Sequence, residues 1–242
     1  MKSKIFIMIM IFTVIFSFGV YAGEAEDILA LALEKQNYDT LQADVTVEMG
    51  IPHSNKTMTQ KYKYLYKSPG KTRMEIFSPL RQTVIVNEEM ISVKMADGSV
   101  KKINKLDMPG VDSINVIKDW NIENILNQYK ISLADEYNFN DMQCIDIRLL
   151  SKNNSYLYSI TLGIEKETKK IIKVMTADDK GNTKSLNIYE EIKVIDGVYF
   201  PSSIKGKINN HDGQKLSTIQ VKIDYRNIVI NSNIDESEFK LQ

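Results

Sequence analysis

The chain has 242 residues, and its 31 Lys and Arg residues balance 31 Asp and Glu residues, so the formal net charge is +0 at pH 7. Neither sign of charge dominates a long segment, which leaves no electrostatic basis for binding nucleic acid. A single cysteine, Cys144, excludes an internal disulfide, so the fold must rest on its hydrophobic core. We expect Cys144 to be an inert strand residue rather than a reactive thiol.

The first 22 residues have the features of a secretory signal peptide. Lys2 and Lys4 precede an apolar run from Ile5 to Phe18, and Val20-Tyr21-Ala22 supplies the cleavage consensus. We expect cleavage after Ala22 and a periplasmic mature protein. The alternative is an uncleaved membrane anchor, because the run approaches the length of a spanning helix. The polar residues that follow Ala22 favour cleavage, and no cysteine nearby would carry a lipid.

An amphipathic helix is predicted at the start of the mature chain, from Glu24 to Asn37. Its apolar residues recur at helical spacing among charged ones and are Ile28, Leu29, Leu31, Ala32 and Leu33. Such a stripe must be buried against another element.

Most of the remaining chain alternates between apolar and polar residues, which is typical of half-buried antiparallel strands. The first clear run holds Leu41, Ala43, Val45, Val47 and Met49, and a late run holds Ile219, Val221, Ile223 and Tyr225. Turns are predicted at Asp97-Gly98, Lys180-Gly181-Asn182, Asp196-Gly197 and Asp212-Gly213. About ten strands at this spacing indicate a barrel or a large curved sheet. No linker or repeat divides residues 23–242, so a single domain is expected.

The stretch YKYLYKSPGKTRMEIFSP, residues 62–79, consists of two alternating runs joined at Pro69-Gly70. Successive side chains on a strand point to opposite faces. The first run therefore places three tyrosines on one face, namely Tyr62, Tyr64 and Tyr66. The second run places Met74 and Ile76 together in the same way.

One segment breaks the alternation, DSINVIKDWNIENILNQY from Asp112 to Tyr129. Its apolar residues repeat every three or four positions, which predicts a helical insert, in one piece or two. Together with the N-terminal helix, this insert is expected to cover the concave face of the sheet.

Residues for covalent chemistry are scarce. His53 and His211 both fall in predicted turns, and neither spacing suits a zinc site or a catalytic triad. Adjacent acidic pairs such as Glu88-Glu89 diverge on a strand and are expected to be solubilising charges. We therefore expect no enzyme activity, no metal and no cofactor. A hydrolase or isomerase that uses an apolar cavity is the remaining enzymatic alternative.

The order of these elements resembles the LolA-like superfamily of outer membrane lipoprotein-sorting proteins and lipoprotein carriers. The resemblance covers the mature chain and includes YKSPGKTRMEIFSP, the hairpin VIVNEEMISVKMADG, IKVIDGVYFPSSIKGKI and KIDYRNIVINSNIDESEFKL. It implies an incomplete antiparallel β-barrel whose open side is covered by helices around an apolar cavity. It also implies a periplasmic carrier or binding protein for acyl chains of lipoproteins or other lipids.

On this resemblance, the candidate ligand-binding residues are Val45, Val47, Met49, Tyr62, Tyr64, Tyr66, Met74, Ile76 and Trp120. Methionine adapts to irregular apolar ligands, and tyrosine joins an apolar ring to a polar hydroxyl. The implied partners are a lipidated protein or long-chain lipid, an inner-membrane exporter and an outer-membrane acceptor, with the protein itself a monomer.

The chain departs from the carriers just before Pro69. Carriers place there an arginine that latches the helical lid, and this chain has Ser68. The neighbouring Lys67 is expected to point to the other face of the sheet. Burial of Ile117, Trp120, Ile125 and Leu126 is then expected to hold the lid. The alternative function is an RseB-like envelope-stress sensor that binds lipidated ligands and a membrane partner.

Overall fold

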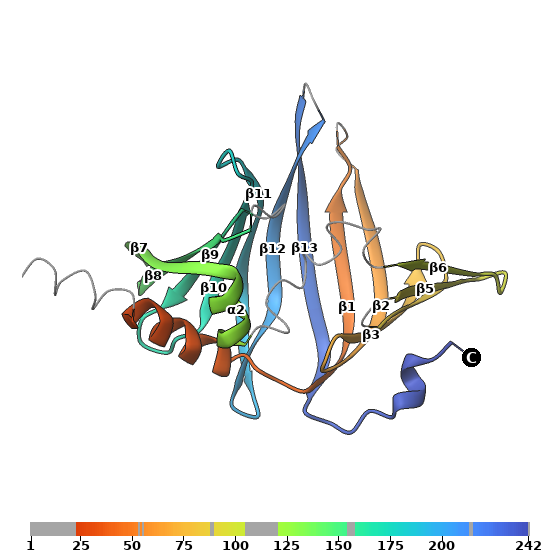
Figure 1. Ribbon diagram of the computed structural model, residues 1–242. Coiled ribbons are helices and arrows are strands. Elements are labelled where there is room, and N and C mark those ends of the chain that lie inside the picture. The colour runs from red at the N-terminus through yellow and green to blue at the C-terminus, as the bar shows by residue number, and fades with distance from the viewer. Residues whose placement is uncertain are drawn as a thin grey trace, which may run out of the picture. The chain divides into compact units, whose positions relative to one another are not determined.

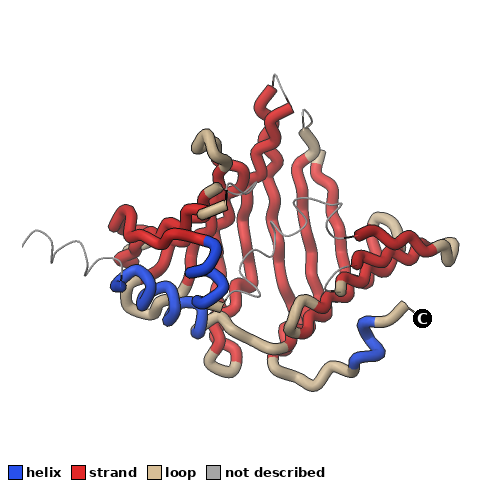
Figure 2. The backbone as a smooth tube through the Cα atoms, viewed as in Figure 1, coloured by secondary structure: helices blue, strands red, loops and turns tan. Residues whose placement is uncertain are grey.

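The computed structural model describes residues 23–52, 54, 56–87, 90–104, 121–153, 158–212 and 215–241. Within these ranges, thirteen strands form one antiparallel sheet in the order β6-β5-β4-β3-β2-β1-β13-β12-β11-β10-β9-β8-β7. The sheet is open, because β6 and β7 are its two edges. Figure 2 shows how strongly strands predominate over helices.

The chain divides into two compact units. Unit 1 combines the residues up to Lys35 with Asn121–Thr183, and unit 2 combines Gln36–Trp120 with Lys184–Gln242. The expectation of a single domain from residue 23 to residue 242 stays a prediction. Each unit is described below by itself.

Unit 2 contains the long strands at the centre of the sheet. Its first half supplies β1 (Thr40–Gly50), β2 (Thr57–Lys67), β3 (Lys71–Ser78), β4 (Gln82–Val86), β5 (Met90–Met95) and β6 (Val100–Asn104). Its second half supplies β11 (Thr183–Ile195), β12 (Val198–Asp212), β13 (Lys215–Ile230) and the short 3-10 helix η3 (Glu236–Phe239). Strand β1 lies between β2 and β13, so the first and last strands of the chain are hydrogen-bonded neighbours (Figure 1).

Unit 1 contains the N-terminal helix, which covers residues 23–34, and α2 (Ile122–Gln128). Its strands are β7 (Tyr129–Phe139), β8 (Met142–Ser151), β9 (Ser159–Glu165) and β10 (Ile171–Ala177). The N-terminal helix buries Leu29, Ala32 and Leu33 of the predicted stripe, together with Ala25, whereas the predicted Leu31 is 45% exposed. One face of β8 and β9 is equally buried, through Ile147, Leu149, Ile160, Leu162 and Ile164. The helix is drawn across these strands in Figure 1, and we infer that the two buried surfaces pack together.

Glycines with positive φ occupy most of the predicted turns. Gly98 (φ 84°), Gly181 (φ 79°) and Gly197 (φ 80°) occupy three of the four predicted turns. The fourth, at Asp212-Gly213, lies partly outside the described residues, although β12 ends at Asp212 and β13 begins at Lys215. Pro69-Gly70 also forms a turn between β2 and β3.

The predicted fold class is confirmed as a mainly β protein with helices and an open antiparallel sheet. It has more strands than the ten or so expected. The helical insert is observed in part: α2 covers Ile122–Gln128, capped by the Asn121 side chain, while residues 112–120 lie outside the described residues. Its role as a lid stays a prediction.

Candidate functional site

The register of unit 2 brings the tyrosines of β2 opposite alternate residues of β1. Leu41 lies opposite Tyr66, Ala43 opposite Tyr64, and Val45 opposite Tyr62. Residues opposite each other on neighbouring strands share a face of the sheet. We call this side the tyrosine face, made of Leu41, Ala43, Val45, Val47 and the residues aligned with them on neighbouring strands.

The alignment continues from β2 onto β3. Tyr62 lies opposite Ile76, and Tyr64 opposite Met74. On the other side of β1, Val45 lies opposite Tyr225 and Val47 opposite Ile223. One row thus runs Tyr225, Val45, Tyr62 and Ile76 across four strands.

The next row reaches further into the second half of unit 2. Val47 lies opposite Gln60 on β2 and Ile223 on β13. Ile223 in turn lies opposite Ile204 on β12, and Ile204 opposite Tyr189 on β11. None of the positions in these two rows carries a charge.

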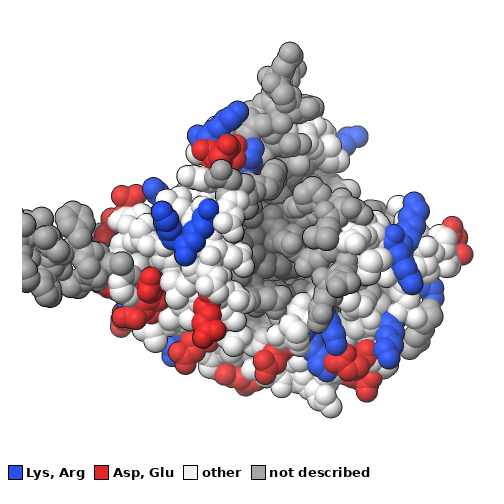
Figure 3. Space-filling view, in the orientation of Figure 1, with Lys and Arg blue, Asp and Glu red and all other residues white. Residues whose placement is uncertain are grey.

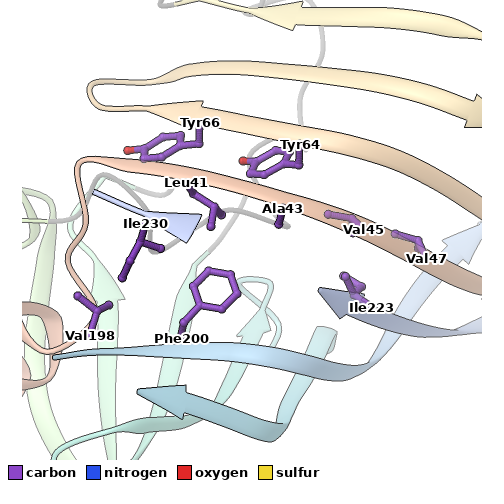
Figure 4. Close-up of a cluster of buried hydrophobic side chains, with 10 residues drawn as sticks. All are labelled: Leu41, Ala43, Val45, Val47, Tyr64, Tyr66, Val198, Phe200, Ile223 and Ile230. Atoms are coloured by element: carbon purple, nitrogen blue, oxygen red, sulfur yellow. The ribbon is translucent and has the colours of Figure 1, made fainter. Parts of the chain in front are cut away.

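A buried cluster marks the centre of the tyrosine face. Its ten buried residues are Leu41, Ala43, Val45, Val47, Tyr64, Tyr66, Val198, Phe200, Ile223 and Ile230. Figure 4 shows these side chains projecting from their strands toward a common space. Partly buried side chains pack around it, among them Tyr38, Met49, Tyr62, Met74, Ile204 and Tyr225. The face therefore has a dry centre and a margin that keeps some exposure.

Eight of the nine predicted ligand-binding residues lie on this face. Val45, Val47, Tyr64 and Tyr66 belong to the buried cluster, and Met49, Tyr62 and Met74 pack against it. Ile76 is buried beside Tyr62 in the register. Trp120 lies outside the described residues. That these side chains contact a ligand stays a prediction.

Sequence reasoning missed several aromatic residues that other segments of unit 2 add to the face. The sequence pattern places Tyr225 on a strand, but it does not indicate that Tyr225, Tyr38, Tyr189 and Phe200 belong to this face. The ring of Phe200 meets Tyr225 edge to face, with centroids 5.2 Å apart, and lies 5.9 Å from Tyr38. Tyr38 also meets Tyr66 edge to face at 5.8 Å. Alternation along β13 indicates which of its residues share a face of the sheet, but it does not indicate that β13 pairs with β1.

Burial governs the chemistry of these tyrosines. Desolvation raises the pKa of Tyr225 to about 12 and raises the pKa values of Tyr62, Tyr64 and Tyr189 well above the ordinary value of a tyrosine. A negative charge on Tyr225 would raise the pKa values of Tyr62, Tyr64 and Tyr189 in addition to desolvation. The Tyr225 hydroxyl therefore lies close enough to the other three hydroxyls to interact with them electrostatically. They remain neutral hydrogen-bonding groups throughout the physiological pH range.

The opposite face of β2 and β3 holds the C-terminal tail, residues 231–241. Leu65 on β2 packs with Ile234 and Phe239 in a second buried cluster. The Lys67 ammonium donates to the Ile234 carbonyl at 2.9 Å, and the Lys71 ammonium lies 2.6 Å from the Glu236 carboxylate. Lys67 therefore lies on the face away from the tyrosines, where it contacts the C-terminal tail, as strand alternation predicts.

Unit 1 carries a separate polar cluster on the face of its sheet away from the buried isoleucines. The Lys173 ammonium lies 2.8 Å from the Asp146 carboxylate and 4.4 Å from the centre of the Tyr137 ring. Burial raises the pKa of Tyr137, and the nearby Asp146 carboxylate raises it further. No hydrogen bond of good geometry satisfies the buried Tyr137 hydroxyl. Desolvation also raises the pKa of the buried Cys144, which disfavours a reactive thiolate.

Other kinds of site find little support in the described part of the chain. No group of His, Cys, Asp and Glu side chains there could hold a metal ion. His53 lies outside the described residues, as does the turn beside His211. No described helix is both long and apolar enough to cross a membrane. Figure 3 shows acidic and basic side chains intermixed over the visible face.

Comparison with solved structures identifies the fold. A DUF1329 family protein from Desulfovibrio piger superposes with a TM-score of 0.69 at 13% identity, covering 90% of this chain and 97% of that one. A LolA superfamily protein from Nitrosomonas europaea gives a TM-score of 0.67 at 17% identity, with the same coverage. The fold is LolA-like.

A third solved structure shares this fold. A putative outer membrane lipoprotein-sorting protein domain from Vibrio parahaemolyticus gives a TM-score of 0.65 at 12% identity, covering 90% of this chain and 97% of that one. At such identities the likeness concerns the fold alone. No protein-family profile and no curated protein sequence matches the chain.

Proposed function

We propose that the protein binds the acyl chains of lipids or lipidated proteins on the tyrosine face and carries them across the periplasm. The observation that carries this proposal is the uncharged, apolar surface built by alternate residues of β1, β2, β3 and β13. Its half-buried members include Tyr62, Met49 and Met74. Such a surface can enclose a flexible hydrocarbon without a specific counter-ion.

The physical basis of binding is burial of hydrocarbon. Each methylene moved from water into an apolar site contributes about 0.8 kcal/mol. Two acyl chains would therefore bind tightly even if ordering them cost several kcal/mol. Met49 and Met74 suit such a ligand, because the unbranched thioether side chain repacks around different shapes.

The location and the partners follow from the same proposal. The N-terminal 22 residues would direct export as a cleaved signal peptide, and the mature protein would act in the periplasm as a carrier. The LolA-like fold, shared with a lipoprotein-sorting domain, supports this assignment. An inner-membrane donor and an outer-membrane acceptor would complete the route, and the proposal involves no covalent chemistry.

Native mass spectrometry of the protein purified from its own envelope tests this function. We expect mass additions that fragment to fatty acyl groups and disappear after delipidation. Protein that never carries an acylated species, and takes up none when mixed with native lipids, would contradict the proposal. A sensor would instead retain one membrane protein partner whose association changes when lipid is supplied.

A further inference from the structure

Four tyrosines of unit 2 surround the apolar centre of the tyrosine face without a described hydrogen-bond partner. Tyr38, Tyr62, Tyr189 and Tyr225 are all half-buried, and no hydrogen bond joins their hydroxyls to another residue in the described part of the chain. Tyr64 differs, because Thr72 provides its hydroxyl with a hydrogen bond. A half-buried hydroxyl without a protein partner requires water or a ligand group.

Two of these tyrosines occupy matching places on either side of β1. Tyr62 on β2 and Tyr225 on β13 both lie opposite Val45. They therefore flank a single apolar residue from adjacent strands. Tyr189 lies in the next row, beyond Ile204 and Ile223, on the same face. An acyl chain along β1 would pass between the Tyr62 and Tyr225 side chains.

The charge of the surroundings limits what these hydroxyls can recognise. On β1, β2, β3 and β13, the aligned positions around Val45 hold only apolar or uncharged residues, including Gln60 and Thr72. The nearby cations Lys61 and Lys63 alternate with Tyr62 and therefore project to the opposite face. A carboxylate or phosphate placed beside Val45 would lose its hydration without gaining a counter-ion. An ester carbonyl needs only a hydrogen-bond donor.

We infer that Tyr62 and Tyr225 donate hydrogen bonds to an ester carbonyl of the bound lipid, so the tyrosine face selects neutral acyl esters over free fatty acids. The inference rests on the proposed function and names the chemical class of its ligand. Burial of both rings keeps the hydroxyls protonated, and therefore able to donate, far above neutral pH. Tyr189 lies one row away, where it can reach a second carbonyl of a diacyl lipid.

Competition among three ligands of one chain length tests the inference. A fluorescent alkyl probe bound to the mature protein is displaced with hexadecane, methyl hexadecanoate or hexadecanoate. We expect the ester to compete best, hexadecane to follow, and the carboxylate to compete worst at pH 8. Each hydrogen bond is expected to improve affinity by roughly three- to ten-fold.

Isosteric substitutions then locate the effect. Tyr62→Phe and Tyr225→Phe should each reduce the affinity for the ester by roughly three- to ten-fold while leaving that for hexadecane unchanged. Tyr199→Phe is the matched control, since Tyr199 precedes Phe200 on β12 and points to the opposite face. It should change neither affinity.

The possible failures are distinguishable. Equal affinities for ester and alkane, or tightest binding of the carboxylate, would overturn the ester preference while acyl binding stands. Preserved ester affinity in both phenylalanine variants would remove Tyr62 and Tyr225 from the recognition. Failure of the alkyl probe and of all three ligands to bind would overturn the proposed function and this inference together.

Discussion

The ammonium group of Lys67 lies 2.8 Å from the carboxylate of Glu236, which ties β2 to the C-terminal tail on the face away from Tyr64 and Tyr66. Arg73 adds a hydrogen bond of 2.8 Å to the Glu238 carbonyl. The side chain of Asp235 accepts a hydrogen bond from the Ser237 amide and so caps η3. The tail thus covers the outer side of the strands that carry the tyrosines.

Removing the aromatic anchor of the tail should destabilise unit 2. Phe239 is 3% exposed and packs with Leu65 and Ile234. We expect Phe239→Ala to lower the free energy of unfolding by about 3 kcal/mol, as for other buried aromatic truncations. Val229→Ala, at a side chain 46% exposed, is the control and should change it by less than about 0.5 kcal/mol. If urea unfolding showed the same loss of unfolding free energy for Phe239→Ala and Val229→Ala, Phe239 would not anchor the tail.

The contribution of Glu236 should depend on pH. Hydrogen bonds from Lys67 and Lys71 lower the pKa of Glu236 from 4.5 to about 2. A carboxylate with a depressed pKa in the folded state stabilises the protein above its unfolded pKa and loses that effect as pH falls through the folded value. Wild type should therefore exceed Glu236→Gln in stability at neutral pH, and the difference should vanish between about pH 4.5 and about pH 2. A difference independent of pH, measured by thermal unfolding, would contradict this account.

The tyrosine face should resist alkaline titration. Burial raises the pKa of Tyr38 and Tyr64 well above 10 and that of Tyr225 to about 12. Groups whose folded pKa is raised contribute stability that is present below the unfolded value, near 10, and is lost as pH rises through the folded value. In the folded protein, ultraviolet titration should show a set of tyrosines that do not ionise near pH 10. The same tyrosines should ionise near pH 10 once the protein is unfolded. Ionisation of every tyrosine near pH 10 in the folded protein would be inconsistent with a dry face.

In unit 1, the side chain of Tyr137 should require a glycine at position 163. A Cβ at Gly163 would lie within 3.0 Å of the Lys173 side chain and closer still to the Tyr137 hydroxyl. Gly163→Ala should therefore destabilise the protein by about 1 to 3 kcal/mol. Adding Tyr137→Phe removes the clashing oxygen and should recover part of that loss. A double variant whose loss is the sum of the single losses would show that the two positions do not interact.

Local sequence patterns were enough to predict the faces of the strands. Alternation placed Tyr62, Tyr64 and Tyr66 together and Lys67 on the other side, because the side-chain period of a strand is fixed. Glycine marked the turns at Gly98 and Gly197 for an equally local reason.

Contacts between distant segments were beyond this kind of prediction. Tyr225 joins the face only because β13 pairs with β1, and no local pattern states that partner. The Phe239 anchor was missed for the same reason, since Leu65 meets the tail from across the chain. The turn at Asn140-Asp141 was missed because it has positive φ without glycine (48° and 63°).

Acyl binding on the tyrosine face is tested most directly by a pair of substitutions on β3. Met74 lies on that face opposite Tyr64, while Phe77, three residues on, is 52% exposed and has no register partner on β2. The measurement is equilibrium binding of a fluorescent acyl ester to folded wild type, Met74→Glu and Phe77→Glu. The account predicts saturable binding by wild type and Phe77→Glu, and its loss in Met74→Glu, because the new carboxylate would be desolvated against the acyl chain. Undiminished binding by a folded Met74→Glu variant would contradict the account.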